Sequence, residues 1–316
     1  MVSELTVPQL EGACLLVDHG LIRAIGPDAG AFLQGQLTND VLALDGSAAR
    51  LAGFCSAKGR LQASFLVWKA AGDEFLLACS ASILAPTLKR LSMFVLRAKC
   101  KLNDATGDVQ LFGLAGVTAE RWLDGLPAMR TVRRGAATVV ALPDAAGARR
   151  ALVALPAGER LDLADAPTLS VDAWRWLEVQ SGIVTIEAAT VDRFVPQMVN
   201  FELVGGVDFK KGCYPGQEVV ARSQYRGTTR RRAFLFDCET TPTAGQDVFV
   251  AGDSGEAAGT VANAAPRPDG RGGSALVEVR LASMSGEDLR LGSPDGPRLR
   301  QAELGYRVPT EAEPAT

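Results

Sequence analysis

Short apolar runs bounded by turn residues recur along the chain and predict β-strands. In the first half of the chain these runs occupy residues 14–17, 21–25, 51–56, 61–69, 74–79, 109–114, 137–142 and 151–155. The first two flank the turn residues 18–20 and predict a β-hairpin. The third and fourth flank residues 58–60, another expected turn.

Helical spacing of apolar residues separates groups of these strands. Asp28 is a candidate N-cap for a helix with Phe32, Leu33 and Leu37 on one face, ending at residues 38–40. Further helices are expected over residues 83–95, 118–123 and 170–181. The last begins at Ser170 and ends before Gly182. Strands and helices in this irregular order favour an α+β fold over a doubly wound sheet.

The C-terminal third of the chain has a different pattern of apolar residues from the rest. Apolar runs at residues 234–238, 247–251, 260–263 and 275–281 lie between Gly- and Pro-rich turns, with no helical stripe among them. Short strands in this arrangement are typical of a small antiparallel barrel.

Composition narrows the class of protein. The chain has 316 residues, 47% hydrophobic and 22% charged, which is typical of a globular protein with room for more than one domain. A net charge of −3 gives no general attraction to nucleic acid or to an anionic membrane. Residues 1–12 do not resemble a signal peptide, and no apolar stretch reaches a membrane-spanning length, so we expect a cytoplasmic protein.

Cysteine and histidine usage restricts the chemistry. The six cysteines are scattered and form no Cys-x-x-Cys pair, so neither a metal site nor a redox dithiol is expected. His19 is the single histidine, which disfavours histidine-rich metal clusters and most hydrolase triads. It lies in a predicted turn, where we expect a solvated side chain.

Residues 209–222 combine side chains that no core segment needs. Gly212, Gly216 and Pro215 predict a tight, preformed loop that presents Cys213. Lys210 and Lys211 would favour the thiolate, the reactive form of cysteine. Glu218 would oppose this effect, or would tie down a lysine or the start of a helix at Gln217. The alternative is a structural turn with one buried cysteine.

The same stretch carries a family resemblance. This stretch resembles the signature of the YgfZ family, folate-binding relatives of the glycine-cleavage T-protein (aminomethyltransferase). The matching residues are Lys211, Gly212, Cys213, Tyr214, Gly216, Gln217 and Glu218, followed by Ala221 and Arg222. Residues 28–41, 58–60 and 194–197 resemble other motifs of that family in the same order. The resemblance therefore extends to about residue 232.

This resemblance implies a fold and a ligand. The expected fold is the T-protein-like α+β fold, with two interleaved subdomains in residues 1–232 and a C-terminal β-barrel in residues 233–316. The implied ligand is tetrahydrofolate or a derivative. The implied folate-binding residues are Asn39, Asp40, Arg60, Glu178 and Gln197. Alternatives are helix capping and turn formation for Asn39 and Asp40, and a solvated surface charge for Glu178.

One departure from the T-protein affects the expected activity. Aminomethyltransferases carry an Asp-Asp pair after the hairpin turn, whereas this chain has Gln62 and Ala63, which cannot ionise. The resemblance implies instead support for the assembly or repair of iron–sulfur enzymes, including tRNA-modifying ones. Cys213 would be the working residue and Lys211 would keep it anionic, while Gln217 and Glu218 would hold the loop or a ligand.

Two other functions stay open. One is a tetrahydrofolate-dependent aminomethyl- or methyltransferase. The other is a non-enzymatic module that binds tRNA or a client protein through the arginine run Arg226, Arg230, Arg231 and Arg232, whose alternative is a solvated charge run. We expect a monomer whose partners are a folate and iron–sulfur client proteins, with only an indirect or weak connection to tRNA.

Overall fold

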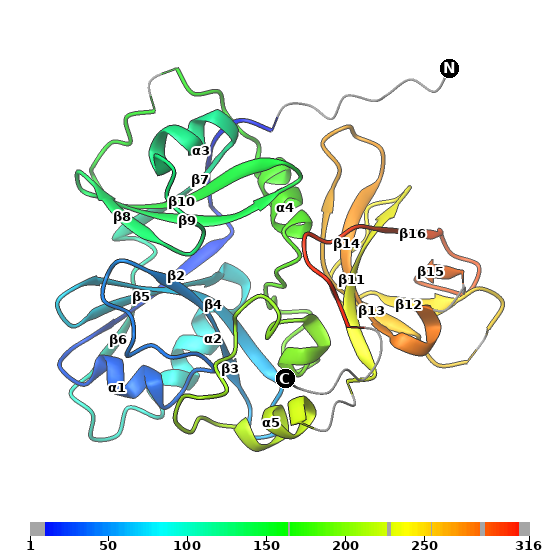
Figure 1. Cartoon of the computed structure of the whole chain (residues 1–316), viewed down its shortest axis with the longest axis horizontal. Helices are drawn as coiled ribbons and strands as arrows, with labels where there is room; N and C mark the ends of the chain where they lie inside the picture. The colour runs from blue at the N-terminus through cyan, green and yellow to red at the C-terminus, as the bar shows by residue number, and fades with distance from the viewer. Residues whose placement is uncertain (1–9, 164, 226–228, 254, 285–287, 310–316) are drawn as a thin grey trace.

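The computed structural model describes residues 10–163, 165–225, 229–253, 255–284 and 288–309. Within them the chain forms three antiparallel sheets that surround the central helix α4 (Val171–Gln180) and the irregular segment after it (Figure 1). The helices of the described residues are all too short or too polar to cross a membrane.

The first sheet comes from the N-terminal part of the chain. Its order is β3-β4-β5-β2-β6. The strands are β2 (His19–Ile25), β3 (Ala49–Cys55), β4 (Leu61–Ala71), β5 (Glu74–Ser80) and β6 (Lys101–Asp104). The predicted β3–β4 hairpin with its turn at residues 58–60 is confirmed, because β3 pairs antiparallel with β4.

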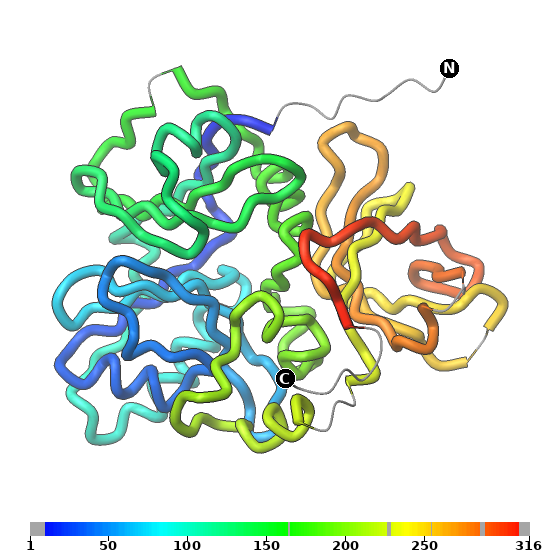
Figure 2. Tube along the Cα trace, viewed as in Figure 1, coloured from blue at the N-terminus to red at the C-terminus, as the bar shows by residue number. Residues whose placement is uncertain are grey.

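The second sheet contains a strand that the sequence assigned elsewhere. Its order is β1-β7-β10-β9-β8. The strands are β1 (Gly12–Leu15), β7 (Val109–Ala115), β8 (Thr131–Arg134), β9 (Ala137–Ala145) and β10 (Ala148–Pro156). The predicted hairpin between the first two strands is wrong, because β1 pairs with β7 while β2 pairs with β5 and β6. Figure 2 shows the blue N-terminal strand beside the green strands of this sheet, where it is the edge strand next to β7.

The helices largely follow the apolar stripes. α1 (Ala29–Gln34) is shorter than predicted, and Asp28 makes no side-chain cap bond because its carboxylate accepts from the Lys99 amide instead. α2 (Ala81–Ser92) and α3 (Gly116–Leu123) match the predicted helices within a few residues. α4 (Val171–Gln180) is capped as predicted, since the Ser170 side chain accepts from the Ala173 amide.

The C-terminal strands form the predicted antiparallel barrel, which is nearly closed. Its strand order is β15-β12-β13-β14-β11-β16, and a single bridge between Arg290 and Arg298 brings the two edges together. The strands are β11 (Arg231–Cys238), β12 (Asp247–Val250), β13 (Gly259–Pro266), β14 (Gly273–Arg280), β15 (Leu289–Leu291) and β16 (Leu299–Ala302). The runs at β15 and β16 are too short to have been predicted as strands.

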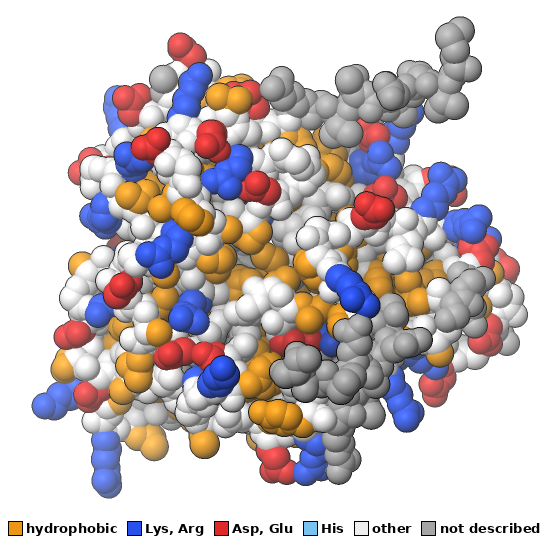
Figure 3. All heavy atoms as spheres, in the orientation of Figure 1, with side chains coloured by type: hydrophobic (Ala, Val, Ile, Leu, Met, Phe, Trp, Pro, Cys, Tyr) orange, Lys and Arg blue, Asp and Glu red, His pale blue; other side chains and the backbone are white. Residues whose placement is uncertain are grey.

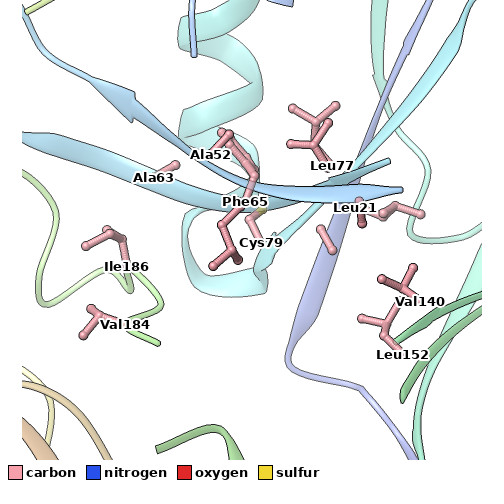
Figure 4. Close-up of a cluster of buried hydrophobic side chains, with 14 of the residues drawn as sticks. Leu21, Ala52, Ala63, Phe65, Leu77, Cys79, Val140, Leu152, Val184 and Ile186 are labelled. Carbon is pink, nitrogen blue, oxygen red and sulfur yellow. The ribbon is translucent and has the colours of Figure 1, made fainter. Parts of the chain in front are cut away.

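Buried side chains join the first two sheets to α4. Figure 4 shows Val140 and Leu152 of the second sheet near Leu21 and Cys79 of the first. Trp174 of α4 is fully buried, and a β-carbon at Gly113 would lie 2.5 Å from its ring, so the glycine allows the helix to pack on β7. The barrel docks through a buried hydrogen bond from the Trp176 indole to Ser274, 3.0 Å.

Candidate functional site

A central cavity lies where the two N-terminal sheets meet α4 and the segment that follows it. Its walls are mostly apolar, and the empty space, including solvent at the mouth, amounts to about 690 Å³. Its walls include His19 of β2, Ser64 of β4, Arg150 and Leu152 of β10, and Trp174 and Glu178 of α4. The cavity therefore takes its side chains from β2, β4, β10 and α4, which are far apart in the sequence.

His19 and Glu178 form an ion pair on the cavity wall. The His19 Nε2 lies 3.1 Å from a Glu178 carboxylate oxygen, and its Nδ1 lies 3.0 Å from Asp18. Burial disfavours the charge, yet the Glu178 and Asp18 carboxylates raise the pKa of His19 to about 10. His19 is thus a cation at neutral pH, and the expectation of a solvated turn residue is wrong, since its side chain is only 15% exposed.

The other side of the His19–Glu178 ion pair faces an outer cleft. This cleft is bounded by the start of α2, by residues 187–189 and by residues 242–244 of the barrel, and it shares His19 and Glu178 with the central cavity. Arg175 reaches Asp18 at 2.6 Å, so the chain of charges continues into the cleft. The ion pair therefore lies between the two hollows.

Arg150 is a buried cation that also lines the cavity. It is 2% exposed. Its Nε donates to the Pro143 carbonyl, 3.0 Å, and its guanidinium lies 5.6 Å from the Trp174 ring centroid. Burial lowers its pKa to about 10, against the opposing effect of Glu178 and Asp144. Arg150 therefore keeps its charge at neutral pH in a largely apolar surrounding.

The cysteine loop lies apart from this cavity. None of the residues on the wall of the central cavity or the outer cleft belongs to residues 209–222. Cys213 and Gly212 are exposed, as is Lys210, whose amide bonds to Asp208, 2.7 Å. The structure thus presents two separate candidate sites.

Lys211 anchors the loop to the segment that follows α1. Its ammonium group donates to the carbonyls of Gln34 and Leu37, the latter at 2.6 Å, and lies 5.0 Å from the Tyr214 ring centroid. Burial lowers its pKa to about 8, although Asp40, Asp208 and Cys213 raise it. Lys211 is therefore partly a structural cation, a role that the sequence did not reveal.

Two glycines let the loop pack against the β3–β4 turn. Gly216 has φ +79°, and a β-carbon there would lie 2.4 Å from the Ser56 carbonyl oxygen. Gly59 has φ +71°, and its β-carbon would lie 2.8 Å from Val219. The motifs at residues 58–60 and 212–222 thus meet in space. α5 (Gln217–Tyr225) begins here, and Glu218 pairs with Arg222 at 2.7 Å rather than with a lysine.

The other predicted folate residues do not line the cavity. The Asn39 amide donates to the carbonyls of Leu51 and Gly205, and its oxygen accepts from the Asp40 amide, as the turn alternative predicted. Arg60 donates to the Arg193 carbonyl. Gln197 is fully buried and donates to the Val220 carbonyl, 2.8 Å, which holds α5. Of the five predicted residues, only Glu178 is on the cavity wall.

Part of the arginine run is internal. Arg231 pairs with the buried Glu278, and Arg232 pairs with Glu202, a carboxylate that is only 4% exposed. Arg230 is exposed, and Arg226 lies outside the described residues. Arg231 and Arg232 therefore belong neither to a solvated charge run nor to a continuous phosphate-binding surface.

Comparison with known proteins identifies the family of this chain. The GCVT N-terminal domain family matches residues 16–142. The chain is 35% identical over 270 residues to the tRNA-modifying protein YgfZ of Edwardsiella ictaluri (strain 93-146), covering 79% of this chain and 78% of that one. It is 31% identical over 282 residues to the YgfZ of Vibrio vulnificus (strain YJ016), covering 85% and 84%. This chain belongs to the YgfZ family.

The YgfZ fold extends to a solved aminomethyltransferase. The crystal structure of glycine cleavage system aminomethyltransferase T from Bartonella henselae superposes with a TM-score of 0.72 at 16% identity, over 97% of this chain and 88% of that chain. At this identity the likeness concerns the fold alone, and it confirms the T-protein-like fold expected from the sequence. In this YgfZ chain Gln62 and Ala63 are both buried, and neither lines the cavity.

Two residues of the cavity were missed by the sequence analysis. His19 belongs to a segment whose sequence resembles any solvated turn, although it begins β2, and Arg150 follows Arg149 in a β-strand with no motif around it. Only the position of Arg150, a charged residue at the start of an otherwise apolar strand, could have signalled it. The pairing of its strand with β7 and β9 then turns it toward the cavity.

Proposed function

We propose that this protein binds tetrahydrofolate or a derivative in the central cavity and uses Cys213 to support the assembly or repair of iron–sulfur enzymes, tRNA-modifying ones among them. The observation that carries the folate part is the pair of opposite charges, Arg150 and Glu178, on the walls of an otherwise largely apolar cavity. Membership of the YgfZ family, whose relatives are called tRNA-modifying, supports the rest.

The residues of the cavity fit a folate by their donor and acceptor types. A pterin ring is flat and apolar on its faces, with hydrogen-bonding groups at its edge. Glu178 accepts and Arg150 donates, while apolar residues such as Leu152 line the walls between them. Bound folate would supply one-carbon or redox chemistry, and the protein would bind and orient it.

Cys213 acts on a partner in this proposal, since it is exposed and away from the cavity. Its thiolate would attack the disulfide formed by an oxidised client cysteine and a small thiol. The new S–S bond would join Cys213 to the small thiol, and the client would leave as a thiolate. A second small thiol would then reduce Cys213. Alternatively the thiolate ligates iron transiently, with the client or a small thiol supplying the other ligands.

The separation of the two sites bears on the role of the folate. No residue of the cysteine loop lines the cavity that holds Glu178 and Arg150. We infer that any one-carbon or redox chemistry of the folate takes place at the junction of the sheets and α4, and not on the thiol.

Aminomethyl transfer is less well supported. Gln62 and Ala63 supply no carboxylate, and His19, with a pKa of about 10, stays protonated near neutral pH and does not serve as a general base. The described residues also do not favour a direct tRNA-binding role. Two arginines of the run pair internally, and basic and acidic side chains are interspersed on the face shown in Figure 3.

Calorimetry with tetrahydrofolate under anaerobic conditions tests the ligand. We expect micromolar binding by the wild type and by Cys213→Ala, and at least about tenfold weaker binding by Glu178→Ala because a charged hydrogen-bond partner is lost. Absence of binding by the wild type would refute the folate proposal.

A cellular assay tests the thiol. In cells lacking this protein, we expect wild type but not Cys213→Ala to restore the activity of an iron–sulfur tRNA-modifying enzyme. Cys238→Ala is the matched control, because Cys238 is buried in the barrel. Full restoration by Cys213→Ala would show that the protein works without the thiol.

A further inference from the structure

Arg150 has hydrogen-bonding capacity that the protein does not use. A guanidinium carries five N–H donors. The Arg150 Nε–H bonds to the Pro143 carbonyl, but Nη1 and Nη2 have no hydrogen-bond acceptor among the described residues. The side chain is 2% exposed and lies on the cavity wall. Leaving the donors of a charged group unpaired on the wall of a largely apolar cavity is costly, so a ligand that accepts from them would recover that energy.

The residues around Arg150 restrict the charge and shape of a ligand that could accept its hydrogen bonds. The Trp174 ring lies beside the guanidinium, and Leu142 and Leu152 form the neighbouring wall. A flexible tail with two carboxylates would bring more charge into this apolar space than one guanidinium can balance. A flat ring with a single carbonyl oxygen at its edge would fit the donors without that cost.

We propose that Arg150 donates to the 4-oxo oxygen of the pterin ring and thereby selects 4-oxo pterins over 4-amino analogues. This inference rests on the proposed folate site. A pterin presents its 2-amino group, N3–H and 4-oxo oxygen along one edge, as two donors followed by one acceptor. The Glu178 carboxylate accepts from the two donors, and the Arg150 guanidinium donates to the acceptor.

The selectivity follows from hydrogen-bond chemistry. Replacing the 4-oxo group with an amino group puts a donor against the Arg150 donors, so that both are left unpaired. A hydrogen bond to a charged group changes affinity by about 10- to 100-fold. A carboxylate such as Glu178 also binds diaminopteridines, so the effect of Arg150 is isolated by comparing two ligands in two proteins.

The experiment uses folic acid and aminopterin, which differ in the 4-oxo or 4-amino group and, with it, in whether N3 carries a proton. Calorimetry would measure the ratio of their dissociation constants for the wild type, Arg150→Met and Arg150→Lys. Methionine keeps an unbranched apolar chain beside Trp174 and removes every donor, whereas lysine keeps a cationic donor. Thermal melting would show that each variant is folded.

We expect Arg150→Met to shift the ratio by about 10- to 100-fold against folic acid, and Arg150→Lys to shift it by less than about tenfold. Pteroic acid, which lacks the glutamate, should show the same loss on Arg150→Met as folic acid does. An unchanged ratio would overturn the inference while leaving a folate site in place. A loss confined to folic acid and aminopterin, with pteroic acid unaffected, would assign Arg150 to the tail instead and also overturn it. Failure of the wild type to bind any of the three would refute the folate site itself.

Discussion

Replacing Glu178 with glutamine removes one of the two carboxylates that hold the charge of His19. The shift of the His19 pKa from 6.5 to about 10 corresponds to roughly 5 kcal/mol of preference for the charged form, at about 1.36 kcal/mol per pH unit. This is an upper limit shared between Glu178 and Asp18. With about half of it assigned to Glu178, the variant should lose about 2 kcal/mol of stability at pH 7.

The pH dependence has a definite sign. The pKa of His19 is higher in the folded than in the unfolded chain, so the folded state binds the extra proton between pH 6.5 and about 10. The stabilisation is complete below pH 6.5 and is lost as the pH rises toward 10. The difference in unfolding free energy between wild type and Glu178→Gln should therefore shrink as the pH approaches 10.

The assay benefits from a single histidine. The His19 ring gives one set of NMR signals, so its titration can be followed without assignment by mutagenesis. We expect a midpoint near pH 10 in the wild type and a midpoint lower by about 1.5 to 3 units in Glu178→Gln. Urea denaturation at pH 7 and pH 10 gives the matching stabilities.

Glu120→Gln is the matched control. Glu120 pairs with Arg149 at 2.9 Å on the surface, so its loss should cost no more than about 1 kcal/mol. A wild-type His19 that titrates near pH 6.5 would refute the reasoning, because the ion pair would then contribute nothing. A stability difference independent of pH would show that Glu178 acts through packing alone.

Three further predictions concern the cysteine loop and the barrel junction. Gly216→Ala should destabilise the protein by about 2–4 kcal/mol in urea denaturation, because the added β-carbon would clash with backbone atoms at a residue with positive φ. Gly212→Ala should cost less than about 0.5 kcal/mol, because the space around Gly212 is open. Equal losses of stability in the two variants would refute this explanation. Brief treatment of the native protein with iodoacetamide should give one main adduct by mass spectrometry, on the exposed Cys213, and rapid labelling of Cys213→Ala would show that another thiol is accessible. Arg232→Met should cost about 3–5 kcal/mol because the buried Glu202 loses its partner, and adding Glu202→Gln should recover much of that loss; no recovery would mean that the cost lies elsewhere.

Much of the candidate chemistry could be read from local sequence, but its assembly could not. The cysteine loop was predicted from its glycines, lysines and thiol, and the structure keeps it as an exposed turn that leads into α5. Gln197 and Arg60 were predicted as ligands because of their place in motifs. Their side chains bond to backbone carbonyls and do not line the cavity, which sequence spacing does not reveal.

The sequence by itself determined the local elements of this protein. Apolar periodicity gave the main strands, the helices α2 and α4 and the barrel, because these patterns report which face of an element is buried. Its motifs also indicated the family. Tertiary structure alone decided that β1 leaves β2 to pair with β7, and that His19, Arg150 and Glu178 meet around one cavity. Those choices depend on contacts between residues distant in the sequence, about a hundred positions for β1 with β7 and 159 for His19 with Glu178, and the energy of such contacts leaves no periodic trace in the local sequence.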